Sequence, residues 1–214
     1  MKEKAPAKDS TAKGPGRPRT KPAEVRLEEL MAAAEKLFLE KGVEATTISE
    51  IVEAAQVAKG TFYHYFSAKT DMLEALGRRY TERFMASLEQ AMSACAPDDW
   101  AGRLQVWVHA NVETYAKTYR THDIVYTNHH HHDRSNQAKN DILDQLLEII
   151  EGGRLAGLWS PPEPRVVALL IYSGVHGATD DVIAARTKDV APFARSVAQA
   201  CLQMLVPAGQ PAAR

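Results

Sequence analysis

Residues 59–66, Lys-Gly-Thr-Phe-Tyr-His-Tyr-Phe, carry a cation, hydroxyl groups and an imidazole among several aromatic rings. On one helix these rings cannot all face a protein core, because side chains point in every direction around a helix. Phe62 and Phe66 lie four positions apart and can pin the helix from one side. The residues left to face outward in varying degree are Lys59, Thr61, Tyr63, His64 and Tyr65. Exposed donors and rings on a short helix are typical of a surface that reads a DNA groove.

Four consecutive histidines, His129–His132, followed by Asp133, form a second candidate site. On a helix His129 and His132 share a face, and neutral imidazole is a common ligand of zinc, copper and nickel. Three interpretations stay open: a solvated or partly buried helix end, the polar lining of a site for an organic effector, and a metal site. The composition favours the first, so we expect neither a metal nor a cofactor.

Ser173, His176 and Asp180 fall on one face of one predicted helix and suggest the triad of a hydrolase. Such triads normally come from separate elements and need an oxyanion hole, which nothing in the sequence supplies. We therefore interpret the three residues as packing residues and expect a protein that is not an enzyme.

A helical period of apolar residues runs through nearly the whole chain from residue 23, and no stretch alternates as a half-buried strand does. The pattern predicts a helix over 23–41, a second that opens with Thr47 and Glu50 as a capping box, a turn at 56–59 and a third helix over 60–66. A fourth helix follows, capped by Ser67. Further helices are predicted over 98–119, 122–133, 136–151, 164–186 and 190–205, with breaks at 152–153 and 159–164. The expected fold class is all-α, with about nine helices.

The chain has 214 residues, of which 45% are hydrophobic and 25% charged, which suits one small and one medium globular domain. No window approaches 18 uncharged apolar residues, so we expect no membrane span. The basic N-terminus has no apolar segment behind it and is not expected to be a secretory signal. The two cysteines, Cys95 and Cys201, are far apart in sequence, which fits a reducing cytoplasm.

The net charge of −1 hides an asymmetry. Residues 1–22 carry seven basic side chains against two acidic ones, whereas residues 23–70 carry five basic against eight acidic ones. The basic tail is expected to be disordered. It contains Gly16-Arg17-Pro18-Arg19, which is similar to an AT-hook, an extended element whose arginines enter a narrow minor groove. We predict DNA contacts by Arg17 and Arg19, with a merely solubilising tail as the alternative.

A block of roughly 30 residues resembles the TetR family of repressors. The resemblance is carried by Thr46-Thr47-Ile48, Ile51, Ala55, residues 59–66, Lys69 and Leu73. The DNA contacts that it implies fall on Thr47, Lys59, Gly60, Thr61, Tyr63, His64 and Lys69. The turn departs from the family pattern, with Gln56 where a glycine is usual and Ala58 where a serine is usual. A positive φ would strain Gln56, and Ala58 cannot cap the third helix.

The resemblance also implies an order of domains and a function. Residues 1–22 are the tail, residues 23–70 a three-helix N-terminal helix-turn-helix domain that binds DNA, and residues 71–214 a larger helical-bundle domain for ligand binding and dimerisation. We expect a cytoplasmic homodimer that represses transcription from a palindromic double-stranded DNA operator and is released by a small-molecule effector. An activator, or an architectural DNA binder without an effector, is the alternative. Small residues in the last two predicted helices favour a dimer interface over packing within one chain.

Aromatic and polar residues between positions 80 and 132 predict the lining of the effector pocket, because such a site needs an apolar wall with a few polar anchors. The candidates are Phe84, Trp107, Asn111, Tyr115, Tyr119, Tyr126 and His129. This lining suits a planar or elongated, mostly apolar effector with one polar end.

Overall fold

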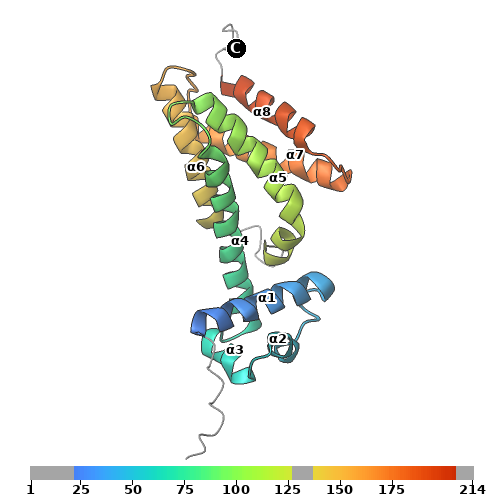
Figure 1. The fold of residues 1–214 in the computed structure, drawn as a ribbon. Helices are drawn as coiled ribbons and strands as arrows, with labels where there is room; N and C mark the ends of the chain where they lie inside the picture. Colours follow the sequence, from blue (N-terminus) through green and yellow to red (C-terminus); the bar gives the residue numbers. More distant parts are fainter. Residues whose placement is uncertain (1–21, 127–136, 206–214) are drawn as a thin grey trace, which may run out of the picture.

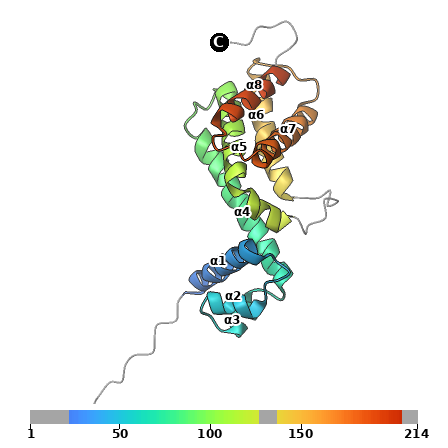
Figure 2. The same ribbon diagram turned by 90° about the vertical axis from the view of Figure 1, so that its right-hand side faces the viewer.

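The computed structural model describes residues 22–126 and 137–205, and every regular element in these ranges is an α-helix. The eight helices described are α1 (Ala23–Lys41), α2 (Ile48–Ala54), α3 (Lys59–Tyr65), α4 (Lys69–Met92), α5 (Trp100–Tyr126), α6 (Gln137–Leu155), α7 (Pro164–Ala184) and α8 (Ala191–Leu205). Helices α1–α3 form a small unit at one end, α5–α8 form a larger bundle at the other, and α4 runs from one to the other (Figures 1 and 2). The predicted all-α class is confirmed.

The first hydrophobic core holds the small unit together. Helices α2 and α3 have seven residues each, too few to be stable alone in water, so packing must hold them. Phe38 of α1, Ile51 of α2 and Phe62 of α3 are almost completely buried against one another and against the start of α4. The orientation of α3 is therefore set by α1, α2 and α4 together.

Helix α4 belongs to both cores, because its apolar residues recur every three or four positions along 24 residues. Leu73 and Leu76 are buried in the first core, and Phe84 and Leu88 in the second. Helix α5 also reaches the first core, where Val125 in its last turn is 1% exposed. The bundle thus meets the small unit through two helices.

Helix α5 corrects the sequence prediction of separate helices over 98–119 and 122–133. It runs without a break from Trp100 to Tyr126, since neither Arg120 nor Thr121 is a helix breaker and both side chains find partners on α1. The remainder of the second predicted helix, with His129–His132, lies outside the described residues.

Helix α6 continues through Gly152 and Gly153, where a break was predicted. A Cβ atom at Gly152 would lie 2.5 Å from the ring of Trp100, and one at Gly153 would lie 2.0 Å from the ring of Trp159. The two glycines therefore let tryptophan rings pack against the helix backbone. Helix α4 also differs from its prediction: Ala68, rather than Ser67, is its N-cap.

One helix of the described part, α7, is long and apolar enough by length and composition to cross a membrane, which the search for wholly uncharged windows did not detect. Core helices of water-soluble proteins satisfy the same criterion, and α7 packs against α5, α6 and α8. Only 28% of its apolar window is buried within the chain, so much of its apolar surface faces outward.

Candidate functional site

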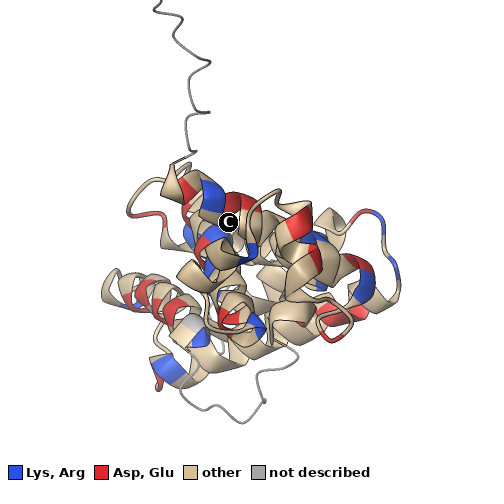
Figure 3. Ribbon diagram, turned by 90° about the horizontal axis from the view of Figure 1, so that it is seen from below, with Lys and Arg blue, Asp and Glu red and all other residues tan. Residues whose placement is uncertain are grey.

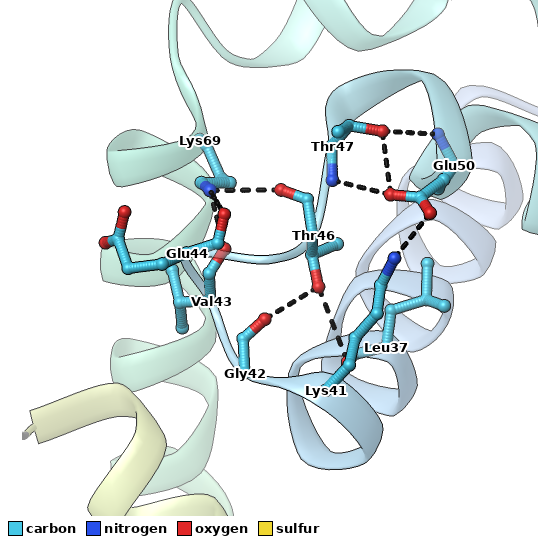
Figure 4. Close-up of polar contacts among 9 residues, drawn as sticks. All are labelled: Leu37, Lys41, Gly42, Val43, Glu44, Thr46, Thr47, Glu50 and Lys69. Atoms are coloured by element: carbon cyan, nitrogen blue, oxygen red, sulfur yellow. Dashed lines mark hydrogen bonds and ion pairs between the residues drawn. The ribbon is translucent and has the colours of Figure 1, made fainter.

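The start of α2 is fixed by the predicted capping box. The hydroxyl of Thr47 accepts a hydrogen bond from the backbone N–H of Glu50 at 3.3 Å, and the N–H of Thr47 donates to the Glu50 carboxylate at 2.8 Å (Figure 4). Lys41 forms an ion pair with the same carboxylate. The hydrogen bond from Lys41, with those from Thr47, lowers the pKa of Glu50 to about 2.

The side chain of Lys69 forms its hydrogen bonds within the protein. Its ammonium group donates to the backbone carbonyls of Val43 at 2.5 Å and Thr46 at 3.0 Å, with the carbonyl of Glu44 at 3.4 Å (Figure 4). An ammonium group has three N–H donors and no acceptor, so these carbonyls occupy it. The first residue of α4 thereby holds the loop between α1 and α2, a geometry that favours a bracing role over the predicted DNA contact.

The turn between α2 and α3 keeps the geometry that the resemblance implied. Gln56 has a φ of +54°. Its N–H donates to the carbonyl of Glu53, and the N–H of Val57 donates to that of Val52, which is the pattern of a Schellman motif. Ala58 is the N-cap of α3 and makes no side-chain cap. The turn therefore keeps a positive φ at Gln56, and Ala58 leaves the start of α3 without a side-chain cap.

Helix α3 has a buried and an exposed face. Phe62 is fully buried and Phe66 is 8% exposed, and their ring centroids lie 5.7 Å apart. Tyr63 is 54% exposed on the other side. The exposed side also carries Lys59, Gly60 and His64, with Thr61 half-buried beside them. The residues predicted to face DNA and those predicted to pin the helix thus separate as expected.

Tyr65 is an exception among the predicted outward residues. It is half-buried, and its hydroxyl donates to the carbonyl of Ala23 at 2.9 Å. The last turn of α3 is thereby joined to the first turn of α1, where the basic tail enters the fold. Arg17 and Arg19 themselves lie outside the described residues.

Charge alone does not mark the α1–α3 end as a nucleic-acid surface. Viewed from that end, basic and acidic positions are interspersed rather than gathered into one basic stripe (Figure 3). Any attraction to phosphate must therefore come from individual side chains such as Lys59 and from the tail.

A second group of candidate residues lies where α4, α5 and α7 meet. We call it the aromatic cluster. It consists of Tyr80, Phe84, Tyr115, His122, Tyr126, Tyr172 and His176. The ring centroid of Tyr115 lies 4.9 Å from that of His122 and 4.5 Å from that of His176. The hydroxyl of Tyr115 donates to Asp180 at 2.8 Å, and the other oxygen of that carboxylate lies 3.3 Å from Nδ1 of His176.

Burial governs the ionisation of the aromatic cluster. It raises the pKa of Tyr80 to about 12 and also raises the pKa of Tyr115, whose hydrogen bond to Asp180 acts in the same direction. Burial lowers the pKa of His122, and His176 nearby adds to this effect, whereas Asp123 opposes it. At neutral pH the phenols and the His122 imidazole are therefore uncharged.

The structure distributes the seven predicted effector residues unevenly. Tyr115 and Tyr126 belong to the aromatic cluster with Phe84, whereas Trp107 is fully buried and donates to Gln145 at 2.8 Å. Asn111, four positions after Trp107 on the same helix, is also buried. Tyr119 packs against the second core, and His129 lies outside the described residues. Two surface hollows, of about 460 Å³ between α1 and α5 and about 600 Å³ beside α5 and α8, are lined by other residues.

Tyr80, Tyr172 and His176 are not among the site residues predicted from the sequence. Tyr172, His176 and Asp180 recur every four positions, and this spacing was the available signal. In the sequence, His176 and Asp180 were instead grouped with Ser173 as a possible hydrolase triad and were interpreted as packing residues. Ser173 is exposed on α7, and no contact between it and His176 is found among the described residues.

Known proteins match the N-terminal part most strongly. The family model for bacterial regulatory proteins of the tetR family matches residues 30–76. The transcriptional regulator AcuR of Cereibacter sphaeroides is 42% identical over 77 residues, which are 36% of this chain and 35% of AcuR. The chain therefore matches about a third of the length of this relative. The transcriptional regulator QacR of Staphylococcus aureus is 21% identical over 70% of this chain and 82% of its own.

The fold of the whole chain also has a solved counterpart. The transcriptional regulator FadR of Bacillus subtilis, in complex with stearoyl-CoA, superimposes with a TM-score of 0.68 at 20% identity, over 83% of this chain and 98% of FadR. All three similar proteins are regulators of transcription rather than enzymes. Residues 30–76, which hold the helix-turn-helix, thus match the tetR family of bacterial regulatory proteins, and the rest of the chain shares the fold of such regulators.

Proposed function

We propose that this protein is a cytoplasmic, sequence-specific transcriptional repressor that binds double-stranded DNA as a homodimer and is released by a small-molecule effector. The observation that carries the DNA-binding part is the two-sided helix α3. Phe62 is fully buried, while Tyr63, next to it in sequence, is 54% exposed. A large ring held outward on a rigid short helix, beside Lys59 and His64, suits insertion into a major groove.

The proposed contacts divide by chemistry. Lys59 is assigned to phosphate oxygens, which position a protein on the duplex. Thr47 is assigned there too, and its hydroxyl would exchange its 2.8 Å hydrogen bond to the Glu50 carboxylate for one to phosphate. Thr61, Tyr63 and His64 are assigned to base edges, and Gly60 to a close approach of the backbone. Lys69 is assigned a bracing role, because its donors are engaged by the loop between α1 and α2.

Homodimer formation is supported by the outer face of α7. Val166 and Leu170 are 49% and 55% exposed there. A Cβ atom at Gly174 or Gly177 would meet nothing within 4 Å in the single chain, so a second helix can approach closely. Met204 extends the apolar surface onto α8. A two-fold pair of α7 and α8 helices would cover this face and present two α3 helices to a palindrome.

The effector is proposed to act at the aromatic cluster. Its rings and hydroxyls supply the apolar wall and the polar anchors that an organic ligand needs, and Tyr80 and Phe84 bring it into direct contact with α4. The solved relative FadR holds stearoyl-CoA, which is a property of that protein. For this chain we propose a mostly apolar molecule with one polar end. It would enter by displacing the rings, among them Tyr115 and Tyr126.

The proposal is tested by selecting ligands for the full chain from a library of randomised duplexes. Repeated selection and sequencing should enrich one inverted repeat, and the mass of the complex in solution should correspond to an even number of chains per duplex. A library that stays random after selection, or a complex with a single chain, would contradict the proposal.

A further inference from the structure

On both α4 and α5, one residue contacts helix α1 and the next residue in sequence packs in the aromatic cluster. On α4, Arg79 contacts α1 while Tyr80 packs in the aromatic cluster. On α5, Thr121 contacts α1 while His122 packs in that cluster, 5.9 Å from the ring of Tyr80. Side chains one position apart project in different directions from a helix. One turn of each helix therefore touches the small unit on one side and the cluster on the other.

Both contacts with α1 meet at Glu35. One carboxylate oxygen accepts from Arg79 at 2.7 Å, and the other lies 3.5 Å from the hydroxyl of Thr121. Nearby, Arg120 donates to the carbonyl of Leu39 at 3.3 Å. A single side chain of α1 is thus bound to α4 and to α5 at the same time.

The ion pair between Glu35 and Arg79 is partly shielded from water. The side chain of Arg79 is 11% exposed and that of Glu35 is 27% exposed. Glu28, which also pairs with Arg79, is 60% exposed. A shielded charge that loses its partner is costly, so the Glu35 carboxylate must stay with Arg79 or move with it. An open surface hollow of about 460 Å³ borders Glu35 and Arg120.

We propose that Glu35 is the positioning residue of a joint, formed with Arg79 and Thr121, through which the aromatic cluster sets the orientation of α1–α3 relative to the bundle. The inference rests on the proposed function, because the orientation of α3 matters only if α3 reads DNA. A ligand that displaces Tyr80 or His122 turns α4 or α5, and Glu35 follows Arg79 and moves α1 with it, at the expense of the longer contact to Thr121. A movement in the bundle then reaches α3 through the contacts of Glu35 with Arg79 and Thr121 as well as through the continuous chain of α4.

The joint is tested by a distance within one chain. Spin labels are attached at Glu53→Cys on α2 and Glu148→Cys on α6, both exposed positions, in a Cys95→Ser/Cys201→Ala background. Labelled chains are diluted into unlabelled protein, so that the distance distribution is intramolecular whatever the oligomeric state. Glu35→Gln should broaden or shift the distribution. The control Glu40→Gln, on the same helix and in an exposed ion pair with Lys36, should leave it unchanged.

A double variant separates orientation from folding. Glu35→Leu/Arg79→Met replaces the pair with apolar groups, which generally preserves stability, and thermal unfolding verifies that it folds. It should also broaden or shift the distribution. A distribution like that of the parent in either variant would overturn the joint, as would an equal effect of Glu40→Gln.

Operator affinity gives a second readout. If Glu35→Gln reduces the population with the competent orientation to about one tenth, affinity falls about tenfold. An unchanged affinity with a broadened distribution would show that orientation does not govern binding and would overturn the inference. If the parent itself selects no operator, the proposed function fails, while the distance measurement still decides whether the joint exists.

Discussion

The hydroxyl of Tyr65 lies 2.9 Å from the carbonyl oxygen of Ala23 and ties the last turn of α3 to the first turn of α1. The tail therefore joins the fold beside the proposed recognition helix. Because residues 1–22 carry five more basic than acidic side chains, this position suits an arm that follows the duplex next to the groove occupied by α3.

Deleting residues 1–21 should weaken operator binding and flatten its salt dependence, by roughly 0.9 in log–log slope for each lost phosphate contact. The measurement is fluorescence anisotropy over a series of salt concentrations. Arg17→Ala/Arg19→Ala should reproduce part of the loss. An unchanged slope in the deletion would leave the tail as a solubilising segment.

Tyr63→Ala should weaken operator binding by about 1–3 kcal/mol without changing the melting temperature, because the ring is exposed. Phe66→Ala is the matched variant on the buried face. It should destabilise the fold by about 3–5 kcal/mol, measured by denaturant unfolding. Wild-type affinity in a folded Tyr63→Ala protein would refute the assignment of Tyr63 to base contacts.

The variant Gly60→Ala distinguishes an effect on the stability of the free protein from an effect on how closely DNA approaches the backbone at residue 60. A Cβ atom at this position meets nothing within 4 Å in the free protein, and alanine favours a helix over glycine by up to about 1 kcal/mol. Stability should therefore stay equal or rise, while affinity for the operator should fall. A variant that binds DNA as tightly as the parent would show that the duplex does not come close to Gly60.

Lys59 and Lys69 should behave differently when their charge is removed. Lys59→Met should reduce the log–log salt slope by roughly 0.9, as expected for one lost phosphate contact. Lys69→Met should lower the melting temperature and leave the slope unchanged, because its ammonium group binds backbone carbonyls. The opposite pattern would restore the DNA contact that the resemblance implied for Lys69.

The buried His122 predicts a dependence of stability on pH. Its pKa is lower in the folded state than in the unfolded state, so the unfolded chain takes up the proton first as the pH falls. The part of the free energy of unfolding that depends on His122 is then fully present above the unfolded pKa of about 6.5 and is lost as the pH falls below it. His122→Gln should show a smaller drop in melting temperature between about pH 7.5 and about pH 5.5.

Asp123, His176 and Asp180 act on the same ring and remain in the His122→Gln variant, which isolates the effect of His122. His64→Gln, at an exposed position on α3, is the control and should keep the drop of the parent. Equal drops in the parent and in His122→Gln would mean that the imidazole does not contribute.

Local signals in the sequence sufficed for the helix-turn-helix. The capping box of Thr47 and Glu50 and the division of Phe62 from Tyr63 depend on neighbours within a few residues, whereas the positive φ of Gln56 was suggested only by the family resemblance. Such features can be predicted because spacing along a helix fixes which side chains meet.

The features that the sequence did not predict depend on distant partners. Gly152 and Gly153 signal a helix end locally, but Trp100 and Trp159 pack against them and the helix continues. Lys69 matches a family DNA contact by type, but the loop carbonyls that occupy it come from residues more than 20 positions earlier. The aromatic cluster is assembled from three helices, so no sequence window contains it.

Whether α3 reads a specific sequence is decided by comparing two duplexes. The affinity of the full chain is measured, at one salt concentration, for the duplex selected from the random library and for a scrambled duplex of equal length and composition. If α3 reads sequence, the selected duplex should bind at least about 1,000-fold more tightly than the scrambled one, and Tyr63→Ala should remove much of this ratio. Equal affinities for the two duplexes would contradict sequence-specific reading by α3.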